Sequence, residues 1–87
     1  MLSEEEVLRD LTDRLTQQIT DVDGYTKSVR GKKLRAELEK FARQMLEGDE
    51  LWEYEWSATV GGRDCYEVGW CVVRDKRAVA RLCAYFS

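Results

Sequence analysis

The sequence predicts an α+β fold in which two N-terminal helices pack on one face of a three-stranded antiparallel β-meander. Apolar residues recur at steps of three and four before Gly48 and at every second position after it, which indicates helices followed by strands. Short glycine or charged segments then divide the second half of the chain into three runs. With 87 residues, the chain is expected to form a single domain over residues 1–87.

The first helix is expected over residues 3–20. Ser3 followed by Glu6 has the spacing of a capping box, in which two side chains satisfy N–H groups at the helix start. An apolar stripe then repeats at helical spacing and consists of Leu8, Leu11, Leu15, Ile19 and Val22. Gly24 indicates a turn after this helix.

The second helix is expected over residues 30–47, with Gly48 as its C-cap glycine. Its apolar stripe consists of Leu34, Leu38, Phe41, Ala42, Met45 and Leu46. The connection between the two helices is short, which favours an antiparallel helical hairpin.

Three strands are expected, at residues 51–60, 65–73 and 78–86. We take Gly61 and Gly62 as the first two-residue hairpin turn, and Asp75 and Lys76 as the second. The register of the strands depends on these turn lengths, because a slip of one residue moves every side chain to the other face.

Aromatic rings occupy alternate positions of the first strand, at Trp52, Tyr54 and Trp56. With two-residue turns, their cross-strand neighbours are small or aliphatic, and Tyr54 lies opposite Gly69. Large rings over small neighbours are typical of a packed face. We therefore interpret this face as the core beneath both helices rather than as a docking surface.

The opposite face of the predicted sheet is also apolar, although two helices are expected to cover only one face. In the same register, Glu53, Trp70 and Arg81 form one row, where Arg81 would lie on the indole ring. A contiguous exposed apolar patch marks an interaction site. We predict a protein interface formed by Tyr66, Val68, Trp70, Val79, Arg81 and Tyr85. Two alternatives remain open: the N-terminal helix covers this face, or the row around Trp70 shields itself.

A basic segment predicts an alternative site. Its cations, with no acid among them, are Lys27, Arg30, Lys32, Lys33 and Arg35. Backbone amides at a helix start, together with these bases, would bind phosphate, so the alternative function is recognition of nucleic acid or another polyanion. A solvated face that pairs with Asp13 and Asp21 explains the same residues, and we favour that interpretation.

The composition argues against catalysis. The chain has no histidine, which removes the commonest general base and most zinc sites. The three cysteines lack a CxxC spacing and are expected to be reduced, with Cys83 the thiol to test for reactivity. Glu53 and Glu55 lie on a flat sheet without the cleft that paired catalytic carboxylates need. We expect no enzymatic activity, no cofactor, no metal and no small-molecule substrate.

Charge and hydropathy restrict the partners. A net charge of −3 disfavours nucleic acid and anionic membranes. No apolar run approaches the about 20 residues needed to span a bilayer, and the acidic N-terminus lacks the regions of a signal peptide. We therefore expect a cytoplasmic, non-enzymatic module that binds a protein partner or itself, with a homodimer as the commonest form. A small inhibitor that blocks a larger assembly is compatible with the same features.

Overall fold

The computed structural model describes residues 3–87, which form three helices and one four-stranded antiparallel sheet. In chain order the elements are α1 (Glu4–Thr12), β1 (Leu15–Ile19), α2 (Val22–Ser28), α3 (Lys32–Ala42), β2 (Glu50–Val60), β3 (Arg63–Arg74) and β4 (Arg77–Phe86). The strands lie in the order β1-β2-β3-β4, so neighbours in the sheet are also consecutive along the chain. The predicted α+β class is confirmed, with one helix and one strand more than the sequence predicts.

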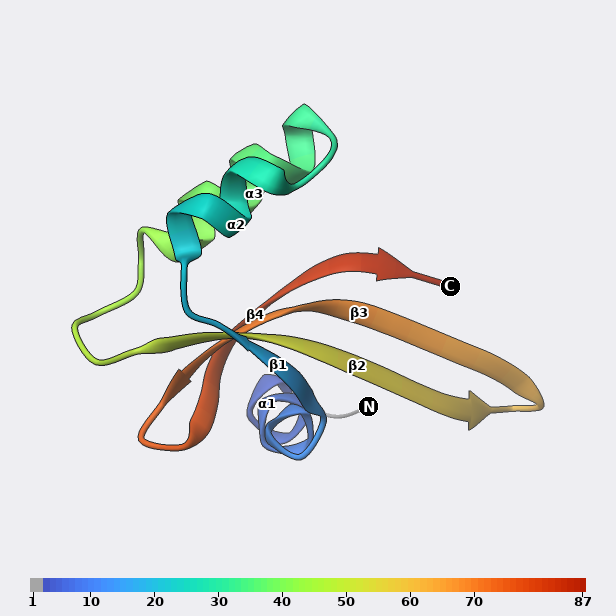
Figure 1. The fold of residues 1–87 in the computed structure, drawn as a ribbon. Coiled ribbons are helices and arrows are strands. Elements are labelled where there is room, and N and C mark those ends of the chain that lie inside the picture. The colour runs from blue at the N-terminus through green and yellow to red at the C-terminus, as the bar shows by residue number, and fades with distance from the viewer. Residues whose placement is uncertain (1–2) are drawn as a thin grey trace.

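The sheet lies between the helices. Figure 1 shows α2 and α3 together on one side of the sheet and α1 on the other. The apolar cluster beneath α2 and α3 is centred on Ile19, Leu38, Leu51, Trp70 and Val72. The cluster beneath α1 is centred on Leu11, Tyr54, Cys71 and Ala78. The prediction that both helices share one face is therefore wrong, because the chain passes from one face of the sheet to the other along β1.

α1 begins at the predicted cap but ends earlier than predicted. The Glu6 N–H donates to the Ser3 hydroxyl over 3.2 Å, as the capping box requires. The last residue is Thr12 rather than residue 20. There the Thr12 hydroxyl accepts a hydrogen bond from the Ala78 N–H of β4 over 3.1 Å. This contact joins the end of α1 to the sheet.

The segment after α1 is a strand, which the sequence analysis did not predict. Leu15 and Ile19 are four residues apart, a spacing that fits a helix. In β1 the register shifts between Leu15 and Gln17, so a bulge separates the two apolar residues. The bulge places Leu15 against the cluster beneath α1 and Ile19 in the cluster beneath α2 and α3.

α2 occupies the segment that was predicted to be a turn. Its N-cap is Asp21, whose carboxylate accepts from the Gly24 N–H over 3.1 Å. A Cβ atom at Gly24 would overlap this carboxylate. The glycine therefore serves a helix cap. The helix predicted over residues 30–47 is the shorter α3 (Lys32–Ala42), and α2 precedes it as an additional helix.

The first hairpin has the turn and the register that the sequence predicts. Gly61 and Gly62 connect β2 to β3 with φ values of +59° and +80°, a region that glycine adopts without strain. Tyr54 pairs with Gly69. A Cβ atom at Gly69 would come within 2.9 Å of the Tyr54 ring and would overlap the Leu82 carbonyl oxygen, so the ring and the neighbouring strand need this glycine.

The second hairpin has the predicted turn but not the predicted register. Asp75 and Lys76 connect β3 to β4 with φ values of 51° and 67°, as in a two-residue turn. The register then shifts between Val72 and Val73, which leaves Val79 in a bulge. Because side chains alternate between faces, this bulge turns over the part of β4 that follows it.

The bulge separates the row that the sequence analysis placed on one face. Glu53 and Trp70 are paired as predicted, but Trp70 pairs with Leu82, whereas Arg81 pairs with Cys71. Arg81 therefore lies on the α1 face of the sheet and Trp70 on the face beneath α2 and α3. The predicted contact between Arg81 and the Trp70 indole is wrong.

Candidate functional site

One end of the sheet extends beyond the helices, except that the Trp56 indole at its inner limit bonds to Asp10 of α1. We call it the distal end and define it by residues 56–60 of β2, 63–68 of β3 and 85–86 of β4. Figure 1 shows the β2–β3 hairpin and the end of β4 extending beyond the helices. Val60, Tyr85 and Phe86 are 60%, 56% and 65% exposed. Tyr85 pairs with Val68 and lies on the face beneath α2 and α3, whereas Phe86, which pairs with Glu67, lies with Val60 on the α1 face. Exposed apolar side chains at one end of a small protein favour an interaction site.

Three of the six predicted interface residues meet at the distal end. Val68 of β3 pairs with Tyr85 of β4. The rings of Tyr66 and Tyr85 pack edge to face with their centroids 6.3 Å apart. Tyr66 and Val68 are half-buried, and Tyr85 is exposed. This part of the predicted surface is accessible to a partner.

Trp70, the centre of the predicted interface, is a core residue. It is only 5% exposed and packs beneath α2 and α3. Its indole N–H donates to the Tyr25 hydroxyl over 2.9 Å, and that hydroxyl donates to the Glu53 carboxylate over 2.6 Å. The expectation of an open face at Trp70 is wrong, because α2 was not predicted and covers it.

The remaining two predicted interface residues lie away from the distal end. Val79 is in the bulge near the β3–β4 turn and lines a hollow of about 790 Å³ between α1 and β4. Arg81 faces α1 and is occupied by two carboxylates: it donates to Glu4 over 3.2 Å and to Glu67 over 3.1 Å. The structure therefore does not unite the six residues in one surface.

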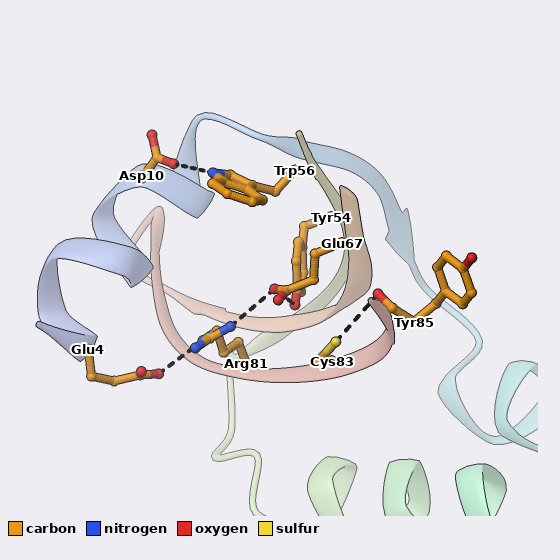
Figure 2. Close-up of polar contacts among 8 residues, drawn as sticks. All are labelled: Glu4, Asp10, Tyr54, Trp56, Glu67, Arg81, Cys83 and Tyr85. Atoms are coloured by element: carbon orange, nitrogen blue, oxygen red, sulfur yellow. Dashed lines mark hydrogen bonds and ion pairs between the residues drawn. The ribbon is translucent and has the colours of Figure 1, made fainter. Parts of the chain in front are cut away.

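The Arg81 contacts belong to a polar network that holds α1 against the sheet. Figure 2 shows Arg81 between Glu4 of α1 and Glu67 of β3. Tyr54 donates to the same Glu67 carboxylate over 2.6 Å, and the ring of Tyr85 points away from this group. A half-buried network with every member paired stabilises one arrangement of the elements. We therefore assign these residues a structural role, the attachment of α1 to the sheet.

A second bond fixes the aromatic strand beneath α1. The Trp56 indole N–H donates to Asp10 of α1 over 3.1 Å. Tyr54 is fully buried, and Trp52 and Trp56 are half-buried. The predicted core role is thus met at Tyr54, under α1 alone.

The pKa values of Tyr54, Cys71 and Cys83, which lie on the α1 face, are all raised. Burial, reinforced by the Glu67 carboxylate, raises the pKa of Tyr54 above its usual value. Burial raises the pKa of the Cys71 thiol to about 12. Burial and the nearby Glu67 carboxylate also raise the pKa of Cys83, whose thiol donates to the Tyr85 carbonyl oxygen over 3.5 Å. A raised thiol pKa lowers the thiolate fraction, so Cys83 lacks the activation that a nucleophile needs.

The outer edge of β2 is unpaired over the distal end. β1 pairs with β2 only up to Tyr54, and the last bond between them runs from the Glu55 N–H to the Arg14 carbonyl over 3.2 Å. Backbone groups of alternate residues point to the same side of a strand. The N–H and C=O groups of Ser57 and Thr59 therefore point outward, and both residues are exposed.

Three features of the distal end are not among the residues predicted from the sequence: Val60, Phe86 and the free edge of β2. Val60 and Phe86 are the apolar ends of predicted strands, so their type was visible in the sequence. Their exposure was not, because it depends on where α1 ends. The edge was missed because the fourth strand, which pairs with only part of β2, was not predicted.

The predicted basic site lies on α2, on the connection to α3, and on the first turn of α3. Lys27, Arg30, Lys32 and Lys33 are exposed, and the Arg35 side chain donates to the Val29 carbonyl over 3.2 Å. Within residues 3–87, none of these cations has a carboxylate within 4.0 Å. They are solvated, as we favoured, but the expected pairing with Asp13 and Asp21 is absent from that part of the chain.

The part of the chain that the structure describes contains no cluster of histidine, cysteine, aspartate or glutamate able to hold a metal ion. In the same residues, no helix has both the length and the apolar character needed to cross a bilayer.

Comparison with protein-family models, with curated proteins and with solved structures finds no match.

Proposed function

We propose that the protein is a non-enzymatic binding module that associates with itself through the distal end of its sheet. The observation that supports this proposal is the group of exposed apolar side chains, Val60, Tyr85 and Phe86, at the end of the sheet beyond the helices. The free energy falls when a partner removes apolar surface from water. A symmetric pair of like surfaces is the commonest form of association among soluble proteins.

Sedimentation velocity tests this proposal over concentrations from about 1 μM to about 500 μM. The variant carries Val60→Ser, Tyr85→Ser and Phe86→Ser together. The matched control is Leu46→Ser, because Leu46 is equally exposed, at 62%, but lies on the connection between α3 and β2. We expect the wild type and the control to dimerise with rising concentration, and the triple variant to dimerise at least about tenfold more weakly.

Two results would contradict the proposed function. A wild type that stays monomeric over the whole range has no self-association to explain. A triple variant that dimerises as tightly as the Leu46→Ser control places the contact elsewhere on the molecule.

We also propose a second function, polyanion binding, because four exposed cations near the start of α3 have no carboxylate partner within residues 3–87. The probe is a fluorescein-labelled single-stranded oligonucleotide. Its affinity should fall steeply as salt rises. Lys32→Glu combined with Lys33→Glu should abolish binding, whereas Lys76→Glu in the β3–β4 turn should not. Absence of binding at low salt, or binding that ignores salt, refutes this function.

A further inference from the structure

We propose that two copies of this chain join edge to edge, with residues 56–60 of β2 pairing antiparallel to the same residues of a second copy about a two-fold axis at Ala58. The pairing would make one continuous sheet from the two four-stranded sheets. This inference rests on the proposed self-association and specifies which part of the distal end makes the contact.

The free edge of β2 offers hydrogen bonds that the described chain does not use. The Glu55 N–H donates outward, to the Arg14 carbonyl. By alternation, Ser57 and Thr59 also present their N–H and C=O groups outward, whereas the backbone groups of Ala58 face β3. An exposed strand edge with unpaired groups is a template for another strand.

This edge lacks the features that prevent strand pairing. Residues 56–60 contain no charged residue and no proline, and the register of β2 with β3 is unbroken along them. The other edge of the sheet, β4, differs. Its pairing with β3 is interrupted by two register shifts, one opposite Val68 and Gly69 and one opposite Val72 and Val73 of β3. Arg81 also places a charge within β4. Bulges and charges are the devices by which edge strands avoid pairing, so β4 is protected and the distal part of β2 is not.

Hydrogen-bond geometry selects one register for the self-pairing. With the axis at Ala58, Ser57 of one copy lies opposite Thr59 of the other, and both residues have outward N–H and C=O groups. This pairing forms on each side of the axis, so all the free groups of both residues are used. An axis at Ser57 would instead place Thr59 opposite Glu55, whose N–H already donates to Arg14.

The side chains in this register are complementary. On the α1 face, Trp56 lies opposite Val60 of the other copy, and the two Ala58 side chains meet at the axis. On the other face, Ser57 lies opposite Thr59. Aromatic with β-branched pairs and hydroxyl pairs stabilise neighbouring strands. The exposed Val60 side chain thereby gains an aromatic neighbour, which accounts for an apolar residue beside the hairpin turn.

Face-to-face stacking of the distal ends is the competing arrangement, and the structure favours it less. Tyr66 and Tyr85 already pack against each other, with an interplanar angle of 62°. Stacking would also leave the outward backbone groups of Ser57 and Thr59 unused. Edge pairing uses the exposed Val60 side chain together with the free backbone groups of β2, whereas Tyr85 and Phe86 lie on β4, at the opposite edge of the sheet.

A charge-swap experiment tests the axis at Ala58. We expect Ala58→Lys alone and Ala58→Glu alone to dimerise at least about tenfold more weakly than the wild type, because like charges meet at the axis. An equimolar mixture of the two should form a heterodimer, identified by its mass in native mass spectrometry, with an affinity close to that of the wild type. Leu46→Lys and Leu46→Glu are the matched controls, and each should dimerise normally. Circular dichroism confirms that every variant is folded.

Three other outcomes contradict the edge pairing, and they show whether the proposed self-association fails with it. If the mixture of folded Ala58 variants stays monomeric, or if either variant alone dimerises as tightly as the wild type, the axis at Ala58 is wrong. If the triple variant at Val60, Tyr85 and Phe86 still weakens association in that case, self-association through the distal end stands and only the edge pairing fails. A wild type that is monomeric throughout overturns both.

Discussion

Replacement of Trp70 by alanine tests whether the indole is a core residue, as in the structure, or a surface residue, as the sequence predicts. The indole is only 5% exposed and packs in the cluster with Leu38 and Leu51. An aromatic side chain buries about 150–250 Å², which at about 25 cal/mol per Å² corresponds to about 4–6 kcal/mol. Measured truncations of buried aromatic residues cost about 3–5 kcal/mol. The variant also removes the N–H group that donates to the Tyr25 hydroxyl.

This loss is large compared with the stability of so small a protein. A chain of 87 residues is expected to unfold with a free energy of about 4–13 kcal/mol. Urea unfolding followed by far-ultraviolet circular dichroism measures the change without relying on tryptophan fluorescence. We expect Trp70→Ala to lose about 3–5 kcal/mol and to be partly unfolded in buffer if the wild type is at the low end of the range.

Tyr85→Ala is the matched control, because Tyr85 is also a large ring on the sheet but is 56% exposed. Its free energy of unfolding should fall by no more than about 1 kcal/mol. If Trp70→Ala unfolds within about 1 kcal/mol of this control, the indole is not part of the core, and the assignment of α2 and α3 to its face of the sheet is refuted.

Two further substitutions test the packing on the α1 face. Gly69→Ala should lower the free energy of unfolding by about 1–3 kcal/mol or more, because the added Cβ overlaps the Leu82 carbonyl oxygen and presses on the Tyr54 ring. Gly48→Ala, at φ +88° with no atom within 4 Å of the added Cβ, should lose only about 1–2 kcal/mol in urea unfolding, from backbone strain; equal losses would contradict the close contact at Gly69. Since the pKa of Tyr54 is raised on folding, its contribution to stability is complete below the usual tyrosine pKa near 10 and is lost as pH rises above it. Tyr54→Phe should therefore flatten the fall in stability above about pH 10, and an unchanged slope would show that the phenol titrates alike in both states.

The strands β2, β3 and β4 and the first hairpin could be predicted because their signals are local. Alternating apolar residues and the Gly61 and Gly62 turn determine the register of β2 with β3, and the pairing of Tyr54 with Gly69 follows directly. The capping box at Ser3 likewise marks the start of α1. In each case the residues that carry the signal also make the contact.

The bulges could not be predicted because they have no comparable sequence signal. Val79 alternates correctly for a regular strand, yet it lies in a bulge that turns Arg81 and Leu82 to the faces opposite to those expected. Leu15 and Ile19 have helical spacing, yet a bulge in β1 sends them to opposite faces. These single-residue insertions decide which face each side chain occupies.

The candidate site could be predicted only in part. Tyr66, Val68 and Tyr85 lie on strand segments without helix cover, so their surface role depends on strand alternation near the distal end. Trp70 was misplaced because the Asp21 and Gly24 cap was interpreted as a turn, and the helix that follows it covers the indole. The free edge of β2 depends on the length of β1, which no periodicity in the sequence determines.

Amide hydrogen exchange tests most directly the claim that the outward backbone groups of β2 bind a second copy. In dilute solution, the N–H groups of Ser57 and Thr59 should exchange rapidly, while the Ala58 N–H, which faces β3, should be protected. As the protein concentration rises, protection should increase at Ser57 and Thr59 and stay constant at Ala58. Exchange at Ser57 and Thr59 that is equally fast at all concentrations would contradict the account.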